Sequence, residues 1–434
     1  MLQPLFKLLR HLYRYGVIET ARRIVAGPTY RASGMGAVYA WRYGWHKGIC
    51  LLRRISGAEC VYVALDHYLG GGATSYLDGQ IGKLPRTAVV LVVRPTPDCA
   101  GRLMVQIRRG GSTEAEAWFF VGGLRTLARL VRFSSLKGAA KKIVINELVR
   151  WEYYERGAKA TNAQMDRLVD SLIEMKRDLS AEMLYLCHDY YSVCPRFTLM
   201  TDGWEYCASE VSREKCRECL ARCENTAFNY ELGISIDGWR ASHARLFAAC
   251  DEVRTFSEDT RRRISACYPE TTPTLVPHEC IAKFDRKPKL SERGITIGVI
   301  GGIHRAKGSR QVEALAKYLW EIGRGDVKIK VVGRLGEIED AELPNNLTVY
   351  GRYQPSELSE IIEREGINVA FFSSVWPETF SYVTQELMML DLPIVCYPIG
   401  APQDRVASYA KGAVALDFTS AAVWNAIREL MHEA

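Results

Sequence analysis

The chain has 434 residues, of which 48% are hydrophobic and 25% are charged, as in globular proteins with two or three domains. No apolar run reaches the ~18 residues that a membrane-spanning helix needs. The first residues, "MLQPLFKLLRHLYRYG", carry charges within their apolar stretch and lack the small-residue cleavage site of a secretory signal. We therefore expect a cytoplasmic protein.

The net charge of +7 is concentrated at the start of the chain, because residues 1–54 hold ten Lys or Arg and one acidic residue. Leucines and isoleucines recur there at roughly helical spacing, with arginines between them. Such a basic amphipathic helix can lie on an anionic membrane surface, or it can pack its apolar stripe on the rest of the protein. We predict a basic helical N-terminal extension over residues 1–55.

The first half after this extension alternates short apolar runs with helical patterns. The run "CVYVALDH" predicts a buried strand, and the glycine turn in "LGGGATSYLDGQIGKL" opens a helix. Further strands are predicted at "TAVVLVVRP", "LMVQIR", "AWFFV", "KKIVINEL" and "EMLYLCHD", with a helix near residues 160–176. A helix, a strand and a helix follow between residues 237 and 268.

A second alternation begins after the charged, proline-containing segment "CIAKFDRKPKLSERG", which we interpret as a linker. Strands are predicted at "ITIGVIGG", "VKIKVVGR", "LTVYGRY", "INVAFFSS", "LPIVCYP" and "GAVALDF", with helices between them. Strands that alternate with helices of this length indicate parallel sheets covered on both faces. We predict two α/β domains, at 56–285 and 286–434, that face a cleft.

The segment "PETFSYVTQE" places Glu378 and Glu386 eight positions apart, directly after a predicted strand. The carboxyl end of a parallel strand is where open α/β sheets bind ligands. We predict that a helix starts here, with Pro377 at its entry. The backbone N–H groups of Thr379, Phe380 and Ser381 would then bind phosphate. Phosphate donors beside two carboxylates that can accept hydrogen bonds from hydroxyls indicate a nucleotide-sugar site.

This segment resembles the E-x7-E motif of retaining GT-B glycosyltransferases of the family 4 type, and the resemblance extends over "SSVWPETFSYVTQELMMLDLPIVCYPIGAPQDRV". It implies the GT-B fold, with two Rossmann-like domains. It also implies that Glu378 binds the hydroxyls of the donor sugar and that Glu386 binds the ribose.

Other segments extend the resemblance, which covers roughly residues 58–434. The turn "IGVIGGIHRAKGS" implies that Lys307, with Arg305 as a second candidate, binds the diphosphate. The segment "VYGRYQPSEL" implies that Arg352 and Tyr353 lie beside the base.

Two further matches lie in the first half of the chain. The loop in "HYLGGGATSY" implies that Gly70, Gly71 and Gly72 approach the diphosphate. The "HD" of "CHDYYSVCPRF" implies that His188 faces the donor sugar.

The chain contains no D-x-D sequence, the motif that commonly holds a divalent metal in the other large glycosyltransferase fold. We therefore predict catalysis without a metal or other cofactor, in which cationic groups stabilise the leaving diphosphate beside an oxocarbenium-like sugar. The predicted catalytic residues are His188, Glu378 and Lys307. The resemblance implies front-face attack and a retained anomeric configuration.

Six cysteines fall within the predicted cysteine-rich loop 187–223. Four of them have a spacing that could close a tetrahedral structural zinc site, with a C-x2-C pair as the clip. Free thiols and a disulfide are the alternatives, although a reducing cytosol disfavours the disulfide. The predicted zinc ligands are Cys194, Cys207, Cys216 and Cys219.

The leading hypothesis is a hexosyltransferase that moves a sugar from a nucleoside-diphosphate sugar to a glycan or lipid-linked acceptor, in the synthesis of bacterial surface polysaccharide such as O-antigen. Its basic extension would place it at the inner face of the membrane. One alternative is a nucleotide-sugar epimerase of GT-B fold. Another is a zinc-containing nucleic-acid-binding protein, although the nearly neutral body argues against nucleic acid as a partner.

Overall fold

The computed structural model describes residues 54–55, 57–67, 70–95, 102–112, 114–134, 138–149, 151, 161–201, 203–208, 212–222, 234–278, 283–336 and 343–432. The described residues form two compact units. The first contains the residues up to Leu186 and Ala241–Glu252, and the second contains residues 187–222, Ser235–Arg240 and the residues from Val253 onward. The predicted N-terminal helix lies outside the described residues.

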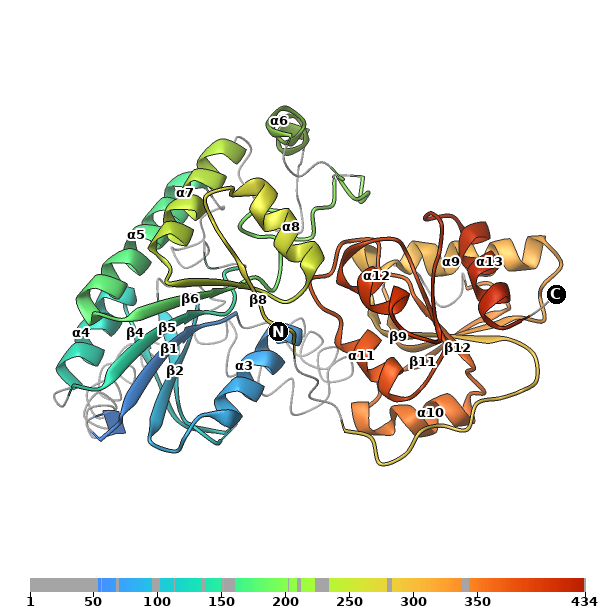
Figure 1. Ribbon diagram of the computed structural model, residues 1–434, viewed down its shortest axis with the longest axis horizontal. Helices are drawn as coiled ribbons and strands as arrows, with labels where there is room; N and C mark the ends of the chain where they lie inside the picture. The colour runs from blue at the N-terminus through green and yellow to red at the C-terminus, as the bar shows by residue number, and fades with distance from the viewer. Residues whose placement is uncertain are drawn as a thin grey trace, which may run out of the picture. The chain divides into compact units, whose positions relative to one another are not determined.

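The first sheet has the strand order β4-β3-β2-β1-β5-β6-β7-β8 (Figure 1). Strand β1 lies between β2 and β5 and pairs with both in parallel. The strands are β1 (Cys60–Leu65), β2 (Ala88–Pro95), β3 (Leu103–Arg109), β4 (Ala115–Val121), β5 (Ala140–Ile145), β6 (Glu182–Leu186), β7 (Glu252–Thr255) and β8 (Thr274–Leu275).

One edge of this sheet differs from the all-parallel sheet that the sequence predicts. Strands β2, β3 and β4 form an antiparallel meander. The reason is the short connections between them, which allow hairpins but leave no room for a crossover helix. The three runs were predicted as strands, and their direction is set only by how they pair.

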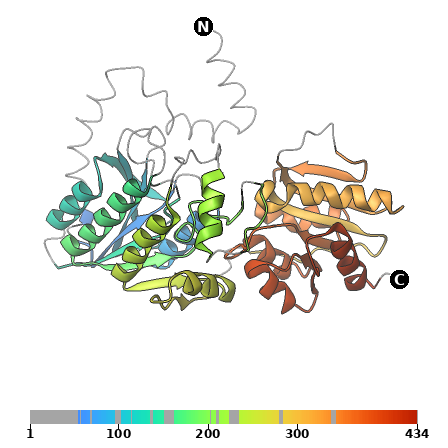
Figure 2. The same ribbon diagram turned by 90° about the horizontal axis from the view of Figure 1, so that it is seen from above.

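Helices cover both faces of the first sheet. Leu77 and Ile81 of α3 (Gly72–Lys83) pack on Val90 and Val92 of β2. Helices α4 (Leu124–Ser134) and α5 (Asn162–Leu179) pack side by side (Figure 2). Three more helices, α6 (Arg213–Arg222), α7 (Ile236–Ala249) and α8 (Glu258–Cys267), complete the described part of this half of the chain.

The second sheet is parallel throughout, with the order β11-β10-β9-β12-β13-β14. Its strands are β9 (Thr296–Ile303), β10 (Lys328–Leu335), β11 (Leu347–Gly351), β12 (Val369–Phe372), β13 (Ile394–Cys396) and β14 (Gly412–Val414). Among the residues described here, the α-helices that accompany them are α9 (Ser309–Glu321), α10 (Leu358–Arg364), α11 (Tyr382–Met389), α12 (Gly400–Ala407) and α13 (Ser420–Leu430). This is the alternation of strands and helices that the sequence predicts.

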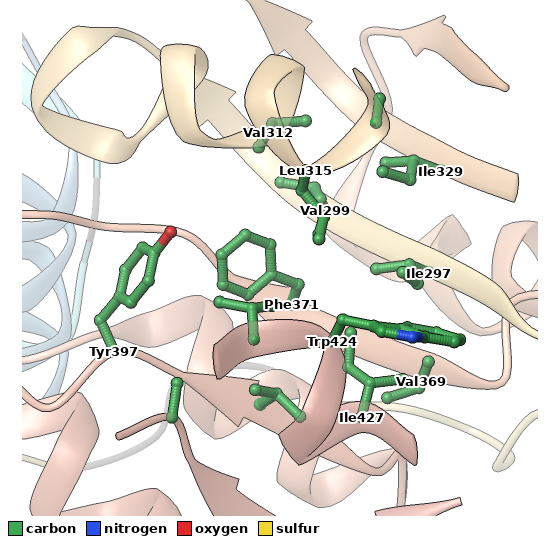
Figure 3. Close-up of a cluster of buried hydrophobic side chains, with 14 of the residues drawn as sticks. Ile297, Val299, Val312, Leu315, Ile329, Val369, Phe371, Tyr397, Trp424 and Ile427 are labelled. Atoms are coloured by element: carbon green, nitrogen blue, oxygen red, sulfur yellow. The ribbon is translucent and has the colours of Figure 1, made fainter. Parts of the chain in front are cut away.

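Alternate residues of these strands point to opposite faces of the sheet, and each face has its own hydrophobic core. Ile297 and Val299 of β9, with Phe371 of β12, pack against α9 and α13 (Figure 3). Ile300 and Phe372 point to the opposite face, where α10 and α11 cover them. Because strands buried on both faces need apolar residues at every position, β12 reads as one continuous apolar run. None of the described helices is both long enough and apolar enough to cross a membrane.

Candidate functional site

The carboxyl ends of β9 and β12 carry the loops of the candidate site. The two strands pair directly, so the residues that follow them meet at one edge of the sheet. The hydroxyl of Ser373 donates to the carbonyl of Lys307 at 2.8 Å, and the amide of Val375 donates to the carbonyl of Ala306 at 3.1 Å. These bonds join the loops that follow the two strands.

Gly308 makes this close approach possible. Its φ is +86°, and a Cβ atom at this position would lie 1.9 Å from the carbonyl oxygen of Ser373. A side chain would therefore meet both a strained backbone and a collision. The turn that presents Lys307 depends on glycine at the next position.

Lys307 and Glu378 meet in this site. The Lys307 Nζ lies 3.5 Å from the Glu378 Oε1, and the Glu378 side chain is only 5% exposed. This buried Oε1 has no hydrogen-bond partner among the described residues. A buried carboxylate oxygen without a hydrogen bond costs free energy, and a group that donates a hydrogen bond to it would remove this cost.

The predicted start of the helix after Glu378 is wrong. The sequence predicts a helix from about Thr379, whereas α11 begins at Tyr382 with Ser381 as its N-cap. The Ser381 hydroxyl accepts a hydrogen bond from the amide of Thr384 at 3.1 Å, the bond that makes serine a preferred cap. Residues 378–381 therefore form a loop, and Glu378 and Glu386 do not share one helix.

The Phe380 side chain lies between two charged or titratable side chains. The His278 ring stacks on it at 4.1 Å with an interplanar angle of 12°, and the Arg405 guanidinium lies 4.5 Å from its centroid. Arg405 also donates to the carbonyl of Ser381 at 2.9 Å. Burial, with a smaller effect of Arg405, lowers the pKa of His278 to about 4. These contacts hold the loop after Glu378 in place.

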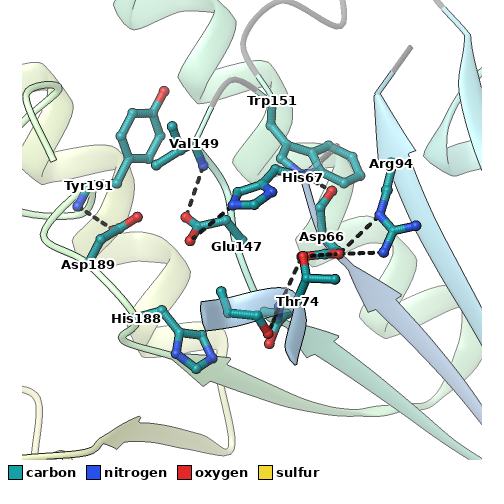
Figure 4. A network of polar contacts seen from close by, with 12 residues as sticks. Asp66, His67, Thr74, Arg94, Glu147, Val149, Trp151, His188, Asp189 and Tyr191 are labelled. Atoms are coloured by element: carbon teal, nitrogen blue, oxygen red, sulfur yellow. Dashed lines mark hydrogen bonds and ion pairs between the residues drawn. The ribbon is translucent and has the colours of Figure 1, made fainter. Parts of the chain in front are cut away.

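His188 follows β6 in the chain and contacts the same loop. Its carbonyl accepts a hydrogen bond from the Thr379 hydroxyl at 2.7 Å, and its ring stacks on Phe256 at 4.6 Å. The carboxylate of Asp189 accepts a hydrogen bond from the amide of Tyr191 at 2.7 Å, which is a local contact (Figure 4). The structure thus brings together His188, Lys307 and the loop of Glu378 from separate parts of the sequence.

Glu386 lies on α11, in a partly buried environment. Burial raises the pKa of Glu386 to about 7. Tyr353, which follows β11, lies close enough that burial and then the Glu386 carboxylate raise the pKa of its phenol. Glu386 and Tyr353 are therefore neighbours, as the predicted ribose and base contacts require.

Glu386 should make protein stability depend on pH in a defined direction. Between pH 4.5, its ordinary pKa, and about 7, the folded protein holds a proton that the unfolded chain has lost. The free energy of unfolding is therefore expected to fall as the pH rises through this range. Urea unfolding at a series of pH values measures it. The variant Glu386→Gln should lose this part of the slope, and equal slopes in both proteins would contradict the assignment.

Arg305 and Arg352 are the remaining predicted residues of the second unit. Arg305 lies in the same turn as Lys307, but its guanidinium is 5.5 Å from the centroid of the Trp204 ring. Arg352 is exposed beside Tyr353. Lys307 is the residue of this turn that pairs with Glu378.

Gly70, Gly71 and Gly72 lie in the first unit, where Gly71 precedes α3 with a φ of +105°. An added Cβ at Gly70 or Gly71 would meet nothing within 4 Å. Their positive φ angles, not crowding, therefore favour glycine. Next to this loop lies a buried polar cluster centred on Asp66, at the end of β1 (Figure 4).

The predicted zinc site is not assembled in the described part of the chain, where no three His, Cys, Asp or Glu side chains are grouped to hold a metal ion. Cys216 and Cys219 lie on α6, a helix with no buried residues, and the Cys216 sulfur accepts a hydrogen bond from Arg240 at 3.5 Å. Burial raises the pKa of Cys194 to about 12. Zinc binding by these four cysteines stays a prediction.

Several residues of the site were not predicted from the sequence. His278 and Arg405 flank Phe380, and Gly400 packs against the Glu378 backbone, where its Cβ would lie 2.7 Å from the amide nitrogen. His278 and Gly400 each follow a strand by a few residues, and this position after a strand could have identified them as candidates for the site. Arg405 lies within a helix, and nothing in its local sequence distinguishes it.

Residues 281–434 match the protein family described as Glycosyl transferases group 1. This part of the chain, which holds Lys307, Glu378 and Glu386, is a domain of that family, and the protein is a glycosyltransferase. No curated protein matches the sequence of the chain.

Solved structures have the same fold. Sucrose-phosphate synthase from Thermosynechococcus elongatus is 13% identical, with 86% of this chain and 90% of that chain covered and a TM-score of 0.52. HepE from Anabaena, in complex with UDP, is also 13% identical, with the same coverage and a TM-score of 0.51. The fold is therefore GT-B, with two Rossmann-like α/β parts.

Proposed function

We propose that this protein is a retaining hexosyltransferase that moves a sugar from a nucleoside-diphosphate sugar to a glycan or lipid-linked acceptor. The observation that carries the proposal is the Lys307–Glu378 pair at the joined ends of β9 and β12. It supplies one cation and one buried hydrogen-bond acceptor within a single site.

Each member of the pair has a role in the proposed reaction. The Lys307 ammonium, about a third exposed, balances negative charge on the diphosphate as the bond to the sugar breaks. The Glu378 Oε1 accepts a hydrogen bond from a sugar hydroxyl, which gives this buried atom a partner. Charge stabilisation by these residues needs no metal ion, so we propose metal-independent transfer.

Uridine is the base that we propose for the donor. HepE, which shares the fold, was solved in complex with UDP. The neighbours Glu386 and Tyr353 would hold the nucleoside, with the Glu386 carboxylate accepting hydrogen bonds from the ribose hydroxyls. This role requires the ionised carboxylate, and with a pKa of about 7 for Glu386 the affinity for UDP should increase as the pH rises through neutrality.

The first test is thermal stability of the full chain with UDP, GDP, dTDP, CDP or ADP, without added metal. A nucleotide at 100 times its dissociation constant adds about 2.7 kcal/mol to the free energy of unfolding. We expect UDP to raise the midpoint and Glu386→Ala to abolish the effect. Stabilisation by another nucleotide would change the base, and no shift with any nucleotide would contradict the proposed function.

An epimerase of the same fold is the second candidate, and donor isomerisation without an acceptor would identify it.

We also propose that the enzyme binds to the surface of a membrane. The basic residues between positions 1 and 54 suit the anionic inner face of a bacterial membrane, where lipid-linked acceptors for surface polysaccharide are found. Salt-dependent binding to anionic vesicles that is lost when this segment is removed would support it.

A further inference from the structure

The first unit contains its own polar site, at the carboxyl ends of β1 and β5. These strands are parallel neighbours, with Leu65 opposite Ile145. Asp66 and His67 follow β1, and Asn146 and Glu147 follow β5. The amides of Asn146 and Glu147 both donate to the carbonyl of Leu65, at 2.9 and 3.1 Å, which fixes the two ends together.

Asp66 is the centre of a cluster that positions this edge (Figure 4). Its fully buried carboxylate accepts hydrogen bonds from Arg94 at 2.7 and 3.0 Å, from Asn146 at 3.0 Å and from Thr74 at 3.1 Å. Its carbonyl accepts the Trp151 indole N–H at 3.1 Å. The cluster therefore joins β1, β2, β5 and the first turn of α3, and it fixes where the glycine loop rejoins the helix.

His67 and Glu147 lie beside this cluster as a buried pair of titratable side chains. Each residue is 8% exposed, and the His67 Nε2 lies 3.9 Å from the Glu147 Oε2. The Glu147 Oε1 accepts a hydrogen bond from the amide of Val149 at 3.3 Å, which orients the carboxylate. At 3.9 Å the ring nitrogen and the carboxylate oxygen are too far apart for a direct hydrogen bond.

We propose that His67 and Glu147 bind a hydroxyl group of the sugar acceptor. The inference rests on the proposed function, which needs a second site for a hydroxyl-bearing substrate. A hydroxyl oxygen can lie within ~2.8 Å of both atoms, donating to the carboxylate and exchanging a hydrogen bond with the imidazole. The pair is buried at the carboxyl ends of β1 and β5, where the hydrogen bond between the adjacent residues Asp66 and Asn146 joins the two segments, so the hydroxyl would be held in one orientation.

The test compares an alcohol with water as the sugar acceptor. The full chain is given UDP-glucose, UDP-galactose or UDP-N-acetylglucosamine, with and without molar glycerol. Glyceryl glycoside, free sugar and UDP are measured. We expect His67→Asn and Glu147→Gln each to lower the ratio of glyceryl glycoside to free sugar by about tenfold or more. Release of UDP in water alone, and stabilisation by UDP, should change less than about twofold.

Two further variants separate this role from a structural one. His243 is a fully buried histidine of α7 in the same unit, so His243→Asn tests the loss of a buried imidazole elsewhere. It should leave the ratio unchanged. Glu147→Asp keeps the charge but shortens the side chain, and it should lower the ratio less than Glu147→Gln. Thermal midpoints show which variants are folded.

The outcomes distinguish failure of the inference from failure of the proposed function. An unchanged ratio in both variants, or an equal loss of hydrolysis and transfer, overturns the role of the pair. A wild-type protein that binds UDP but shows no preference for glycerol over water overturns it as well. If no nucleotide binds and no donor is cleaved, the proposed function fails, and the inference fails with it.

Discussion

Glu378→Gln is expected to lower kcat/KM for the donor by about 100-fold or more, the effect of losing one preorganised charge interaction with the transition state. The glutamine keeps the size of the side chain but not its charge. Lys307 would then face a neutral amide, and the sugar hydroxyl would meet a weaker acceptor. Steady-state release of UDP measures the effect.

The same variant is expected to stabilise the protein without nucleotide. In the wild type, the buried Oε1 of Glu378 has no hydrogen-bond partner among the described residues, which costs about 1–3 kcal/mol. The pair with Lys307, whose side chain is 35% exposed, contributes at most about 1 kcal/mol. Removing the charge should therefore raise the midpoint of thermal unfolding while activity falls.

Glu321→Gln is the control for this prediction, because it makes the same chemical change at an exposed position at the end of α9. It should change neither activity nor stability. A Glu378→Gln protein that keeps full activity would exclude Glu378 from the site. One that loses activity and stability together would show that the carboxylate is structural.

Gly308→Ala is expected to destabilise the second unit by about 3–5 kcal/mol, among the largest effects of a single substitution. Two costs add. Alanine is strained at a φ of +86°, and its Cβ would lie 1.9 Å from the Ser373 carbonyl oxygen. The loops after β9 and β12 would have to separate, so UDP binding should weaken as well. Urea unfolding and the UDP-induced thermal shift measure the two effects.

Gly366→Ala separates the two costs. Gly366 has a φ of +67°, but a Cβ there would meet nothing within 4 Å. This control should therefore lose only the left-handed conformational preference, about 1 kcal/mol. Equal losses of stability at both positions would mean that the loops after β9 and β12 can separate without a free-energy cost. That result would contradict the importance of their close approach at Gly308.

The sequence by itself predicted the strands and helices of the second half, because strands buried on both faces are continuous apolar runs. "INVAFFSS" and "ITIGVIGG" are such runs, and each is a strand in the structure. The sequence also predicted that Lys307 and Glu378 belong to one site, whereas their contact depends on the pairing of β9 with β12, which the structure shows. The E-x7-E motif also placed Glu386 on a helix after this strand.

Only the tertiary structure decided how these residues are held. The helix begins at Tyr382, not near Pro377, because the Ser381 hydroxyl caps it by accepting a hydrogen bond from the amide of Thr384. The ring of Phe380 lies between His278 and Arg405, which are remote in the chain and have no local pattern that links them.

The same holds for the cysteines and for the pair in the first unit. Spacing favoured zinc at Cys194 and Cys216, but only the fold decides whether such ligands meet, and the described residues show no group of three that could hold a metal ion. His67 and Glu147 are 80 positions apart, and they meet only because β1 and β5 are neighbours. Local sequence patterns predict strands, helices and short motifs. Contacts between distant segments depend on which strands pair and which side chains share a buried space.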